Sequence, residues 1–160
     1  MGDNPPVSQV RKQAFIDAPV ERIWELVSDI EHHPQWWPRV AETEMEELVE
    51  ELSEGVTYRQ LTRTPSGTEE MRLTVESVDE FKGLSIRCLT TGTFVRFGLT
   101  GAQDGTFVDG QMGMEPRGLG NRVFDVFAGR RYFSKWIEET FIGLERAASP
   151  APRPERPEAS

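Results

Sequence analysis

The stretch LGNRVFDVFAGRRYFSKWIEETFIGLERAA, residues 119–148, decides how the rest of the chain must fold. Apolar side chains recur in it at steps of three and four residues, at Leu119, Val123, Val126, Phe133, Ile137, Phe141, Leu144 and Ala148. This spacing predicts one long amphipathic helix, because an α-helix has about 3.6 residues per turn. Arg130 interrupts the predicted apolar face.

Length and composition favour a single domain with its own core. A chain of 160 residues has the size of one domain. Cys88 is the single cysteine, so the sequence predicts neither an intramolecular disulfide nor a Cys-x-x-Cys metal site. The net charge of -9 argues against a nucleic-acid surface, because such a surface needs a basic patch.

The sequence predicts neither a membrane span nor a secretion signal. Its apolar runs are shorter than the roughly 18 residues of a transmembrane helix, and residues 1–8 lack the basic and apolar pattern of a signal peptide. We therefore expect a cytoplasmic protein. Residues 1–7 are expected to form a flexible arm, and the proline-rich residues 149–160 a disordered tail.

A strand and two short helices are expected at the start of the chain. Residues 8–16 mix β-favouring apolar and polar types, and either face of this strand could be the buried one. Residues 19–28 have helical spacing of Ile23, Trp24 and Val27, with a proline at the first turn. Asp29 is expected to cap a second helix that ends near Pro34.

Turn signals divide the middle of the chain into six predicted strands. Glycine-containing turns recur about every 9 to 16 residues, which is typical of an antiparallel meander. The acidic stretch 42–54 is expected to be solvated on one face. The predicted strands are 40–50, 56–64, 68–79, 84–91, 93–103 and 106–115.

The dipeptide Asp104-Gly105 gives the clearest local prediction. Asp-Gly favours a two-residue type I′ hairpin turn, which would pair Gln103 with Thr106. The apolar side chains of both strands then fall on one face, because side chains alternate along a strand. The predicted cross-strand pairs are Phe97 with Met112, Val95 with Met114, and Leu99 with Gly110.

The predicted element order indicates an α+β fold. About seven antiparallel strands would expose an apolar face unless another element covered it. The helix 119–148 is the one predicted element long enough to do so, since about 30 residues rise about 45 Å.

Two motifs add a family resemblance to this order. Residues 16–26, IDAPVERIWEL, and the segment with Asp29, Pro34, Trp37-Pro38 and Val40 resemble the START-like (helix-grip, SRPBCC) superfamily, in particular its polyketide cyclase/dehydrase and lipid-transport branch. Gly105-Thr106 and the closing helix are also similar, and the resemblance covers residues 8–148. It implies a helix-grip fold, in which a curved sheet of about seven strands wraps the long C-terminal helix around an apolar cavity.

The resemblance implies several functions rather than one. Members of the superfamily carry lipids, sterols or polyketides, cyclise or dehydrate polyketide chains, or regulate other proteins. Our first hypothesis is therefore a binding or transport protein for a small hydrophobic or amphipathic ligand, with no cofactor. The alternatives are a polyketide aromatase/cyclase or dehydratase, and a protein-interaction regulator that uses the acidic outer face.

Arg130 is the first candidate for a ligand contact. A guanidinium inside an apolar cleft could anchor a carboxylate, enolate or phosphate through two hydrogen bonds. Alternatively, Gly129 bends or rotates the helix, Arg130 extends to solvent, or Arg130 forms a structural ion pair. Tyr58, Gln60 and Ser134 are candidate hydrogen-bond donors in the same cavity, although buried polar groups more often bond to the backbone.

The apolar wall of the cavity is expected to come from three strands, the long helix and a tryptophan. The methionines could form an adaptable wall for a flexible ligand or simply fill the core. The predicted wall residues are Trp37, Met71, Leu73, Val95, Phe97, Met112, Phe127 and Phe133.

The remaining chemistry-bearing residues indicate structural roles. The adjacent residues His32 and His33 cannot chelate one metal from a helix, so we expect no metal site and treat both as solvated turn residues. Asp29 is interpreted as a helix cap and Asp104 as a turn residue. The sequence shows no local signature of a catalytic nucleophile.

Overall fold

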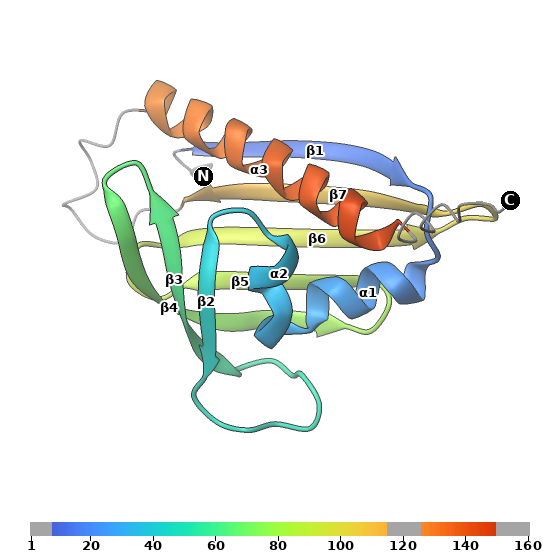
Figure 1. The fold of residues 1–160 in the computed structure, drawn as a ribbon, viewed down its shortest axis with the longest axis horizontal. Helices are drawn as coiled ribbons and strands as arrows, with labels where there is room; N and C mark the ends of the chain where they lie inside the picture. The colour runs from blue at the N-terminus through green and yellow to red at the C-terminus, as the bar shows by residue number, and fades with distance from the viewer. Residues whose placement is uncertain (1–7, 115–125, 150–160) are drawn as a thin grey trace, which may run out of the picture.

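The structure is a computed structural model that describes residues 8–114 and 126–149. Seven antiparallel strands form one sheet in the order β1-β7-β6-β5-β4-β3-β2 (Figure 1). The predicted α+β helix-grip fold is confirmed. The strands are β1 (Ser8–Ile16), β2 (Val40–Met45), β3 (Thr57–Thr64), β4 (Gly67–Asp79), β5 (Gly83–Cys88), β6 (Thr93–Gly101) and β7 (Thr106–Met114).

The helices lie on one face of this sheet. The long helix α3 (Val126–Ala148) crosses β1 and β7, and the shorter helices lie beside its C-terminal half (Figure 1). No helix in the described part of the chain is long and apolar enough to span a membrane. The shorter helices are α1 (Val20–Ser28), the 3₁₀ turn η1 (Ile30–His32) and α2 (His33–Trp36).

The start of the chain follows the sequence prediction closely. The first strand and α1 have nearly the expected bounds, and Pro19 occupies the N-cap position of α1. The inner face of β1, left open by the sequence, carries Val10, Ala14 and Ile16. The part of the predicted long helix before residue 126 lies outside the described residues, as do the predicted arm and residues 150–160 of the predicted tail.

Two predicted boundaries were wrong. Pro34 lies in the first turn of α2 instead of ending a helix, which is the position where a missing backbone N–H costs least. Strand β2 ends at Met45 rather than near residue 50, because the following acidic stretch forms the loop to β3. Asp29 precedes η1 but makes no side-chain cap, and its carboxylate instead contacts His32 Nδ1 at 2.6 Å.

The predicted hairpin register was wrong by two residues, although the predicted inner face was right. Gly101 pairs with Thr106, so the connection has four residues, and the Ala102 N–H donates to the Gly105 carbonyl at 2.8 Å. A shift of two residues keeps every side chain on its own face, because the side-chain period of a strand is two. The observed pairs are Val95 with Met112, Phe97 with Gly110, and Leu99 with Val108.

Two glycines let α3 lie close to its neighbours. A Cβ atom on Gly110 of β7 would lie 2.7 Å from the Phe141 ring. A Cβ atom on Gly143 of α3 would lie 2.2 Å from the carbonyl oxygen of Trp36. The C-terminal half of α3 therefore packs directly on β7 and α2, and any side chain at these positions would force the layers apart.

Replacing Gly143 with alanine is expected to destabilise the protein by about 2 kcal/mol, because the methyl group overlaps a backbone oxygen that has no room to move. In an exposed helix the same change would stabilise by about 1 kcal/mol. Chemical denaturation followed by tryptophan fluorescence measures the difference. Gly98→Ala is the control, since its new Cβ would have no neighbour nearer than 3.8 Å. A Gly143→Ala protein as stable as the wild type would contradict this account of the helix packing.

Candidate functional site

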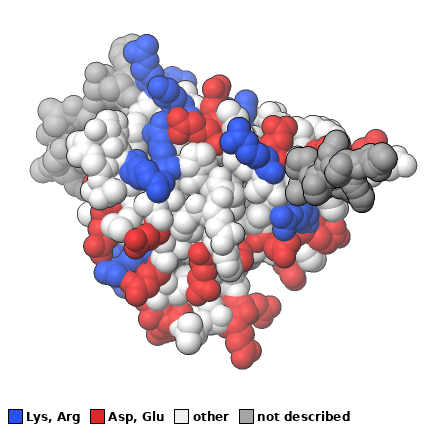
Figure 2. Space-filling view, viewed as in Figure 1, with Lys and Arg blue, Asp and Glu red and all other residues white. Residues whose placement is uncertain are grey.

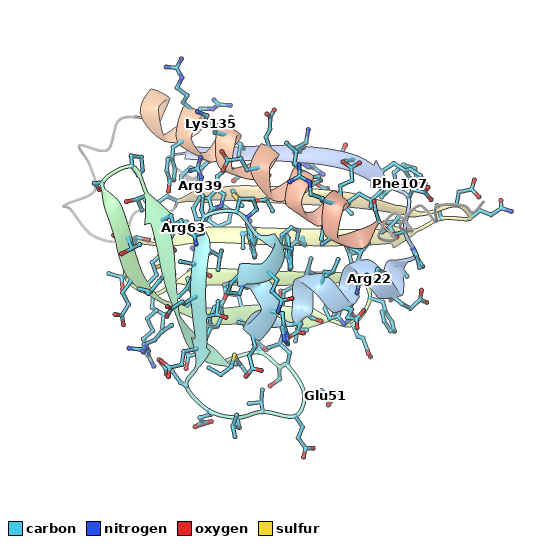
Figure 3. The ribbon with its side chains drawn as sticks, in the orientation of Figure 1. Arg22, Arg39, Glu51, Arg63, Phe107 and Lys135 are labelled. Carbon is cyan, nitrogen blue, oxygen red and sulfur yellow. The ribbon has the colours of Figure 1, made fainter. Side chains whose placement is uncertain are left out.

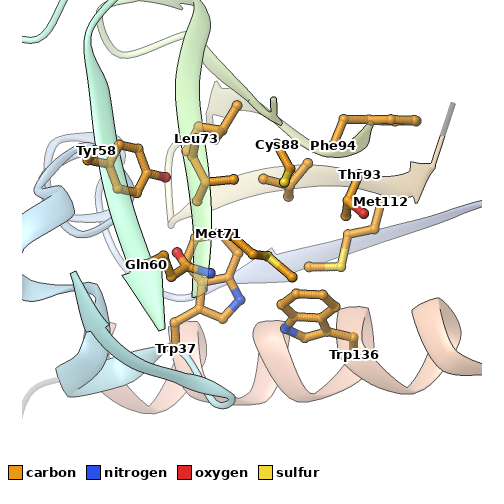
Figure 4. Close-up of a pocket in the computed structure, with 12 residues that line it drawn as sticks. Trp37, Tyr58, Gln60, Met71, Leu73, Cys88, Thr93, Phe94, Met112 and Trp136 are labelled. Carbon is orange, nitrogen blue, oxygen red and sulfur yellow. The ribbon is translucent and has the colours of Figure 1, made fainter. Parts of the chain in front are cut away.

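A pocket lies between α3 and the middle of the sheet. It has a cavity volume of about 40 Å³ and twelve lining residues, which we call the inner pocket (Figure 4). All but two of these residues come from strands β3 to β7, the exceptions being Trp37 and Trp136. The lining comprises Trp37, Tyr58, Gln60, Met71, Leu73, Ile86, Cys88, Thr93, Phe94, Val95, Met112 and Trp136.

A wider space adjoins the inner pocket towards the N-terminal part of α3. This outer cavity has a volume of about 440 Å³. It shares Met71, Thr93 and Trp136 with the inner pocket, so these three side chains stand at the junction of the two spaces. Its other lining residues are Thr64, Ser66, Glu69, Thr91, Met114, Gly129, Tyr132 and Phe133.

The polar groups of the inner pocket are neutral. Tyr58 is buried, and burial raises the pKa of its phenol far above the ordinary value, so the hydroxyl keeps its proton. Gln60 donates from Nε2 to Thr62 Oγ1 at 3.0 Å, and Thr62 in turn donates to the Met71 sulfur at 3.5 Å. Among the twelve lining residues, all of them described, none carries a charge. The pocket therefore suits an uncharged, mainly apolar molecule.

Trp36 and Trp37 lie at the C-terminal end of α2, next to α3. Their rings stack at 5.1 Å, and both are buried. Trp37 donates from Nε1 to Thr140 Oγ1 on α3 at 2.8 Å, and Trp36 donates from Nε1 to the Leu26 carbonyl at 3.1 Å. Trp37 therefore both fills the core and lines the cavity.

Trp136 is the main lining residue that the sequence analysis missed. Its side chain is only 5% exposed, and its ring stacks on Phe133 at 6.4 Å. The Nε1 atom is buried and has no hydrogen-bond partner among the described residues. The helical pattern could have found it, because the buried stripe of α3 is wide enough to include Trp136 and Thr140 next to Ile137 and Phe141.

Arg39 packs against the face of α3 that carries Tyr132 and Trp136. Its guanidinium makes two bonds to the Glu139 carboxylate, Nε at 2.8 Å and Nη2 at 3.2 Å. The guanidinium carbon lies 5.0 Å from the Tyr132 ring centre and 5.8 Å from that of Trp136. Arg39 also has a positive φ of 78°, which a non-glycine residue adopts only when its contacts compensate the strain. It lies beside α3 (Figure 3) and holds Tyr132 and Trp136 in place.

The structure brings most of the predicted wall together. Seven of the predicted ligand contacts line the inner pocket: Trp37, Tyr58, Gln60, Met71, Leu73, Val95 and Met112. Phe133 lines the outer cavity, whereas Phe97 packs edge-on against Trp37 at 5.6 Å within the core. The side chain of Phe127 lies outside the described residues. That these residues bind a ligand stays a prediction.

Arg130 and Ser134 are not in the cavity. Both side chains are exposed on the outer side of α3. The predicted face placed Arg130 three residues before Phe133, but the helix continues its buried stripe four residues back, at Gly129. Arg130 therefore reaches solvent, as in the alternative interpretation, and an Arg130 anchor for a ligand inside the cavity is not supported.

His33 is buried, so the expectation of a solvated turn residue was wrong. It is 0% exposed, packs edge-on against the rings of both Trp36 and Trp37, and contacts the Val27 carbonyl through Nε2 at 2.8 Å. Burial lowers the pKa of His33 from 6.5 to about 4, against the smaller opposing effects of Val27 and Asp29. Over residues 8–114 and 126–149, no cluster of His, Cys, Asp or Glu could hold a metal ion.

A curved sheet wrapped around one long helix, with a neutral pocket between them, defines a helix-grip domain. The sequence profile of the family described as "Polyketide cyclase / dehydrase and lipid transport" matches residues 8–148. The chain therefore belongs to this family. A comparison with curated protein sequences found no match.

Solved structures share the fold at low sequence identity. A START superfamily protein from Mycobacterium smegmatis has a TM-score of 0.73 and 18% identity, over 88% of this chain and 96% of that one. The Zhui aromatase/cyclase from Streptomyces sp. R1128 has a TM-score of 0.64 and 14% identity, over 88% and 90%. The di-domain ARO/CYC StfQ from the steffimycin pathway has a TM-score of 0.65 and 17% identity, over 88% of this chain but only 48% of that one.

Lowering the pH is expected to destabilise the protein through His33. The folded state keeps His33 neutral, so its contribution to stability is complete above pH 6.5 and is lost as the pH falls towards 4. The free energy of unfolding should fall by about 2 kcal/mol between about pH 8 and pH 5. Urea denaturation at several pH values measures this slope.

The two neighbouring histidines provide a matched pair of variants for this test. His33→Gln should remove most of the slope, whereas His32→Gln, at an exposed position, should keep it. Equal slopes in the wild type and the His33→Gln protein would show that the buried imidazole is not the titrating group.

Proposed function

We propose that the protein binds or transports a small hydrophobic ligand in the inner pocket and outer cavity. The observation that carries this proposal is the lining of the inner pocket. Apolar side chains from five strands meet two indole rings there, with a few neutral polar groups among them. Ligand pockets in proteins are typically built in this way, from apolar walls with a small number of placed polar groups.

The placement of α3 supports the proposal. Its C-terminal half packs closely on β7 and α2, where the two glycines remove any gap. Towards the N-terminal end of α3, Trp37 and Trp136 lie between the helix and strands β3 to β5. The inner pocket and the outer cavity remain open there. A fold that needed only a core would fill this space, since protein interiors are close-packed. The widening towards the outer cavity gives a ligand room to enter.

Family membership supports ligand binding but leaves catalysis open. The aromatase/cyclase relatives share the fold with this chain at identities too low to transfer an activity. In a cyclase, the two polar candidates Arg130 and Tyr58 would have to act together on one carbonyl of the substrate. Because Arg130 is exposed on the outside of α3, it does not meet Tyr58 in the pocket. A binding or transport role therefore needs fewer assumptions than a catalytic one.

The third hypothesis, a protein-interaction regulator, has one observation in its favour. Acidic side chains gather in the lower part of Figure 2, where Figure 1 places the loop between β2 and β3. In this loop Leu48 is 92% exposed beside Glu47 and Glu50. Such a loop could meet a partner protein, which stays a prediction, as does the cytoplasmic location. Neither competes with ligand binding in the pocket.

A bulky side chain at the junction of the two spaces is expected to block binding. Thr93→Phe places a ring where the inner pocket meets the outer cavity, so it should weaken a neutral naphthylamine probe at least about tenfold. The probe is N-phenyl-1-naphthylamine, whose fluorescence rises in apolar surroundings. Titration of the wild type should show saturable binding.

Thr100→Phe is the matched control for this experiment. Thr100 lies on the same strand but is exposed, so its replacement adds the same ring away from the pocket. Its affinity for the probe should equal that of the wild type. If Thr93→Phe also bound the probe normally, or if the wild type showed no saturable binding, the proposed pocket function would be wrong.

A further inference from the structure

The lining of the inner pocket includes a buried hydrogen-bond donor on Trp136. The indole N–H of Trp136 is buried and lacks a partner among the described residues, although the side chain is only 5% exposed. Figure 4 shows the indole ring rising from α3 into the pocket, with its nitrogen on the side of Trp37. Leaving a buried donor unsatisfied costs about 1–3 kcal/mol, so such a group in a pocket points to a partner that arrives with a ligand.

The indole N–H of Trp37, in contrast, has a hydrogen-bond partner within the protein. Trp37 lines the same pocket, but its Nε1 already donates to Thr140 at 2.8 Å. Gln60 also lines this pocket and uses one of the two N–H groups of its Nε2 on Thr62. Trp136 differs from Trp37 because its single indole N–H has no partner among the described residues. An indole nitrogen can donate but cannot accept, so the matching ligand atom must be an acceptor.

The surroundings of Trp136 determine the charge of that acceptor. Among the described residues, Arg39 is the cation in contact with the Trp136 ring. It is held by Glu139 through two hydrogen bonds and is not part of the pocket lining. The outer cavity is lined by a negatively charged residue, Glu69. An anionic ligand would lose its hydration in the neutral pocket without gaining an ion pair from the described lining residues.

We propose that Trp136 is a specificity-determining residue whose indole N–H binds the carbonyl oxygen of a neutral ligand with a flat apolar body. This proposal rests on the proposed function of ligand binding and adds the chemical class of the ligand. The apolar body lies against the sheet side of the inner pocket, which Met71, Leu73 and Met112 line. Arg39 acts as a positioning residue, because its contacts with Tyr132 and Glu139 fix the side of α3 that carries the indole.

Three probes of nearly equal shape separate the possible modes of recognition. These probes are 2-acetylnaphthalene, a neutral ketone; 2-isopropenylnaphthalene, its hydrocarbon counterpart; and 2-naphthoate, an anion. Isothermal titration of the wild type should show the ketone binding about tenfold more tightly than the hydrocarbon, the effect of one hydrogen bond. The naphthoate should bind most weakly.

Two tryptophan variants show which indole N–H causes the preference for the ketone. Trp136→Phe keeps an aromatic ring but removes the N–H, so the preference for ketone over hydrocarbon should fall to near one. Trp36→Phe should keep the preference, because Trp36 lines neither the inner pocket nor the outer cavity and its N–H is bonded to the Leu26 carbonyl. The ratio of two affinities within one variant is unaffected by a general loss of stability.

Nuclear magnetic resonance of the wild type gives a direct readout of the hydrogen bond. The chain has four tryptophans, so four indole N–H signals are expected. Replacement of the other three by phenylalanine, one at a time, identifies the Trp136 signal. This signal should move downfield with the ketone and not with the hydrocarbon.

The outcomes distinguish the two proposals. If none of the probes bound, the proposed function itself would fail. If ketone and hydrocarbon bound equally, or the naphthoate bound most tightly, the pocket would stand and the role of Trp136 would be overturned. A ketone preference that survives Trp136→Phe would also overturn it.

Discussion

The close contact of α3 with β7 and α2 is the constraint on which the rest of the structure depends. Gly110 and Gly143 permit this contact, because neither position has space for a side chain. The helix is thereby fixed at its C-terminal half over β1 and β7, at one side of the sheet. The strands further across, β3 to β5, cannot meet its backbone, and the aromatic side chains of Trp37 and Trp136 extend into the space that remains.

The ion pairs of the sheet lie away from the inner pocket, whose lining residues are uncharged. Ion pairs such as Arg11 with Asp109 and Arg72 with Glu46 lie on the exposed outer face of the sheet. The hydrogen bonds from Arg72 and Thr57 lower the pKa of Glu46 to about 2, so the carboxylate stays ionised at neutral pH. Exposed pairs of this kind contribute little to stability. They leave the inner face free for neutral groups, which is what an uncharged ligand requires.

Much of the fold could be predicted from periodicity, and the errors have physical reasons. The inner face of β6 and β7 survived a register error of two residues, because only an odd shift exchanges the faces. The length of the turn could not be predicted from Asp104-Gly105, because this dipeptide occurs both in the expected two-residue turn and in the observed four-residue connection. Arg130 was misplaced because an apolar stripe may step by three or four, and only packing against the sheet selects Gly129.

The site was harder to predict because it depends on contacts between distant residues. Local sequence gives no sign that His33 is buried against Trp36 and Trp37, or that the indole N–H of Trp136 has no hydrogen-bond partner among the described residues. The central claim is that the space between α3 and the sheet is a real apolar pocket. A crystal structure under xenon pressure tests it most directly, since dry apolar cavities bind xenon. We predict xenon in the inner pocket between Met112 and Trp136. A pocket without xenon, filled by collapsed side chains, would contradict the account.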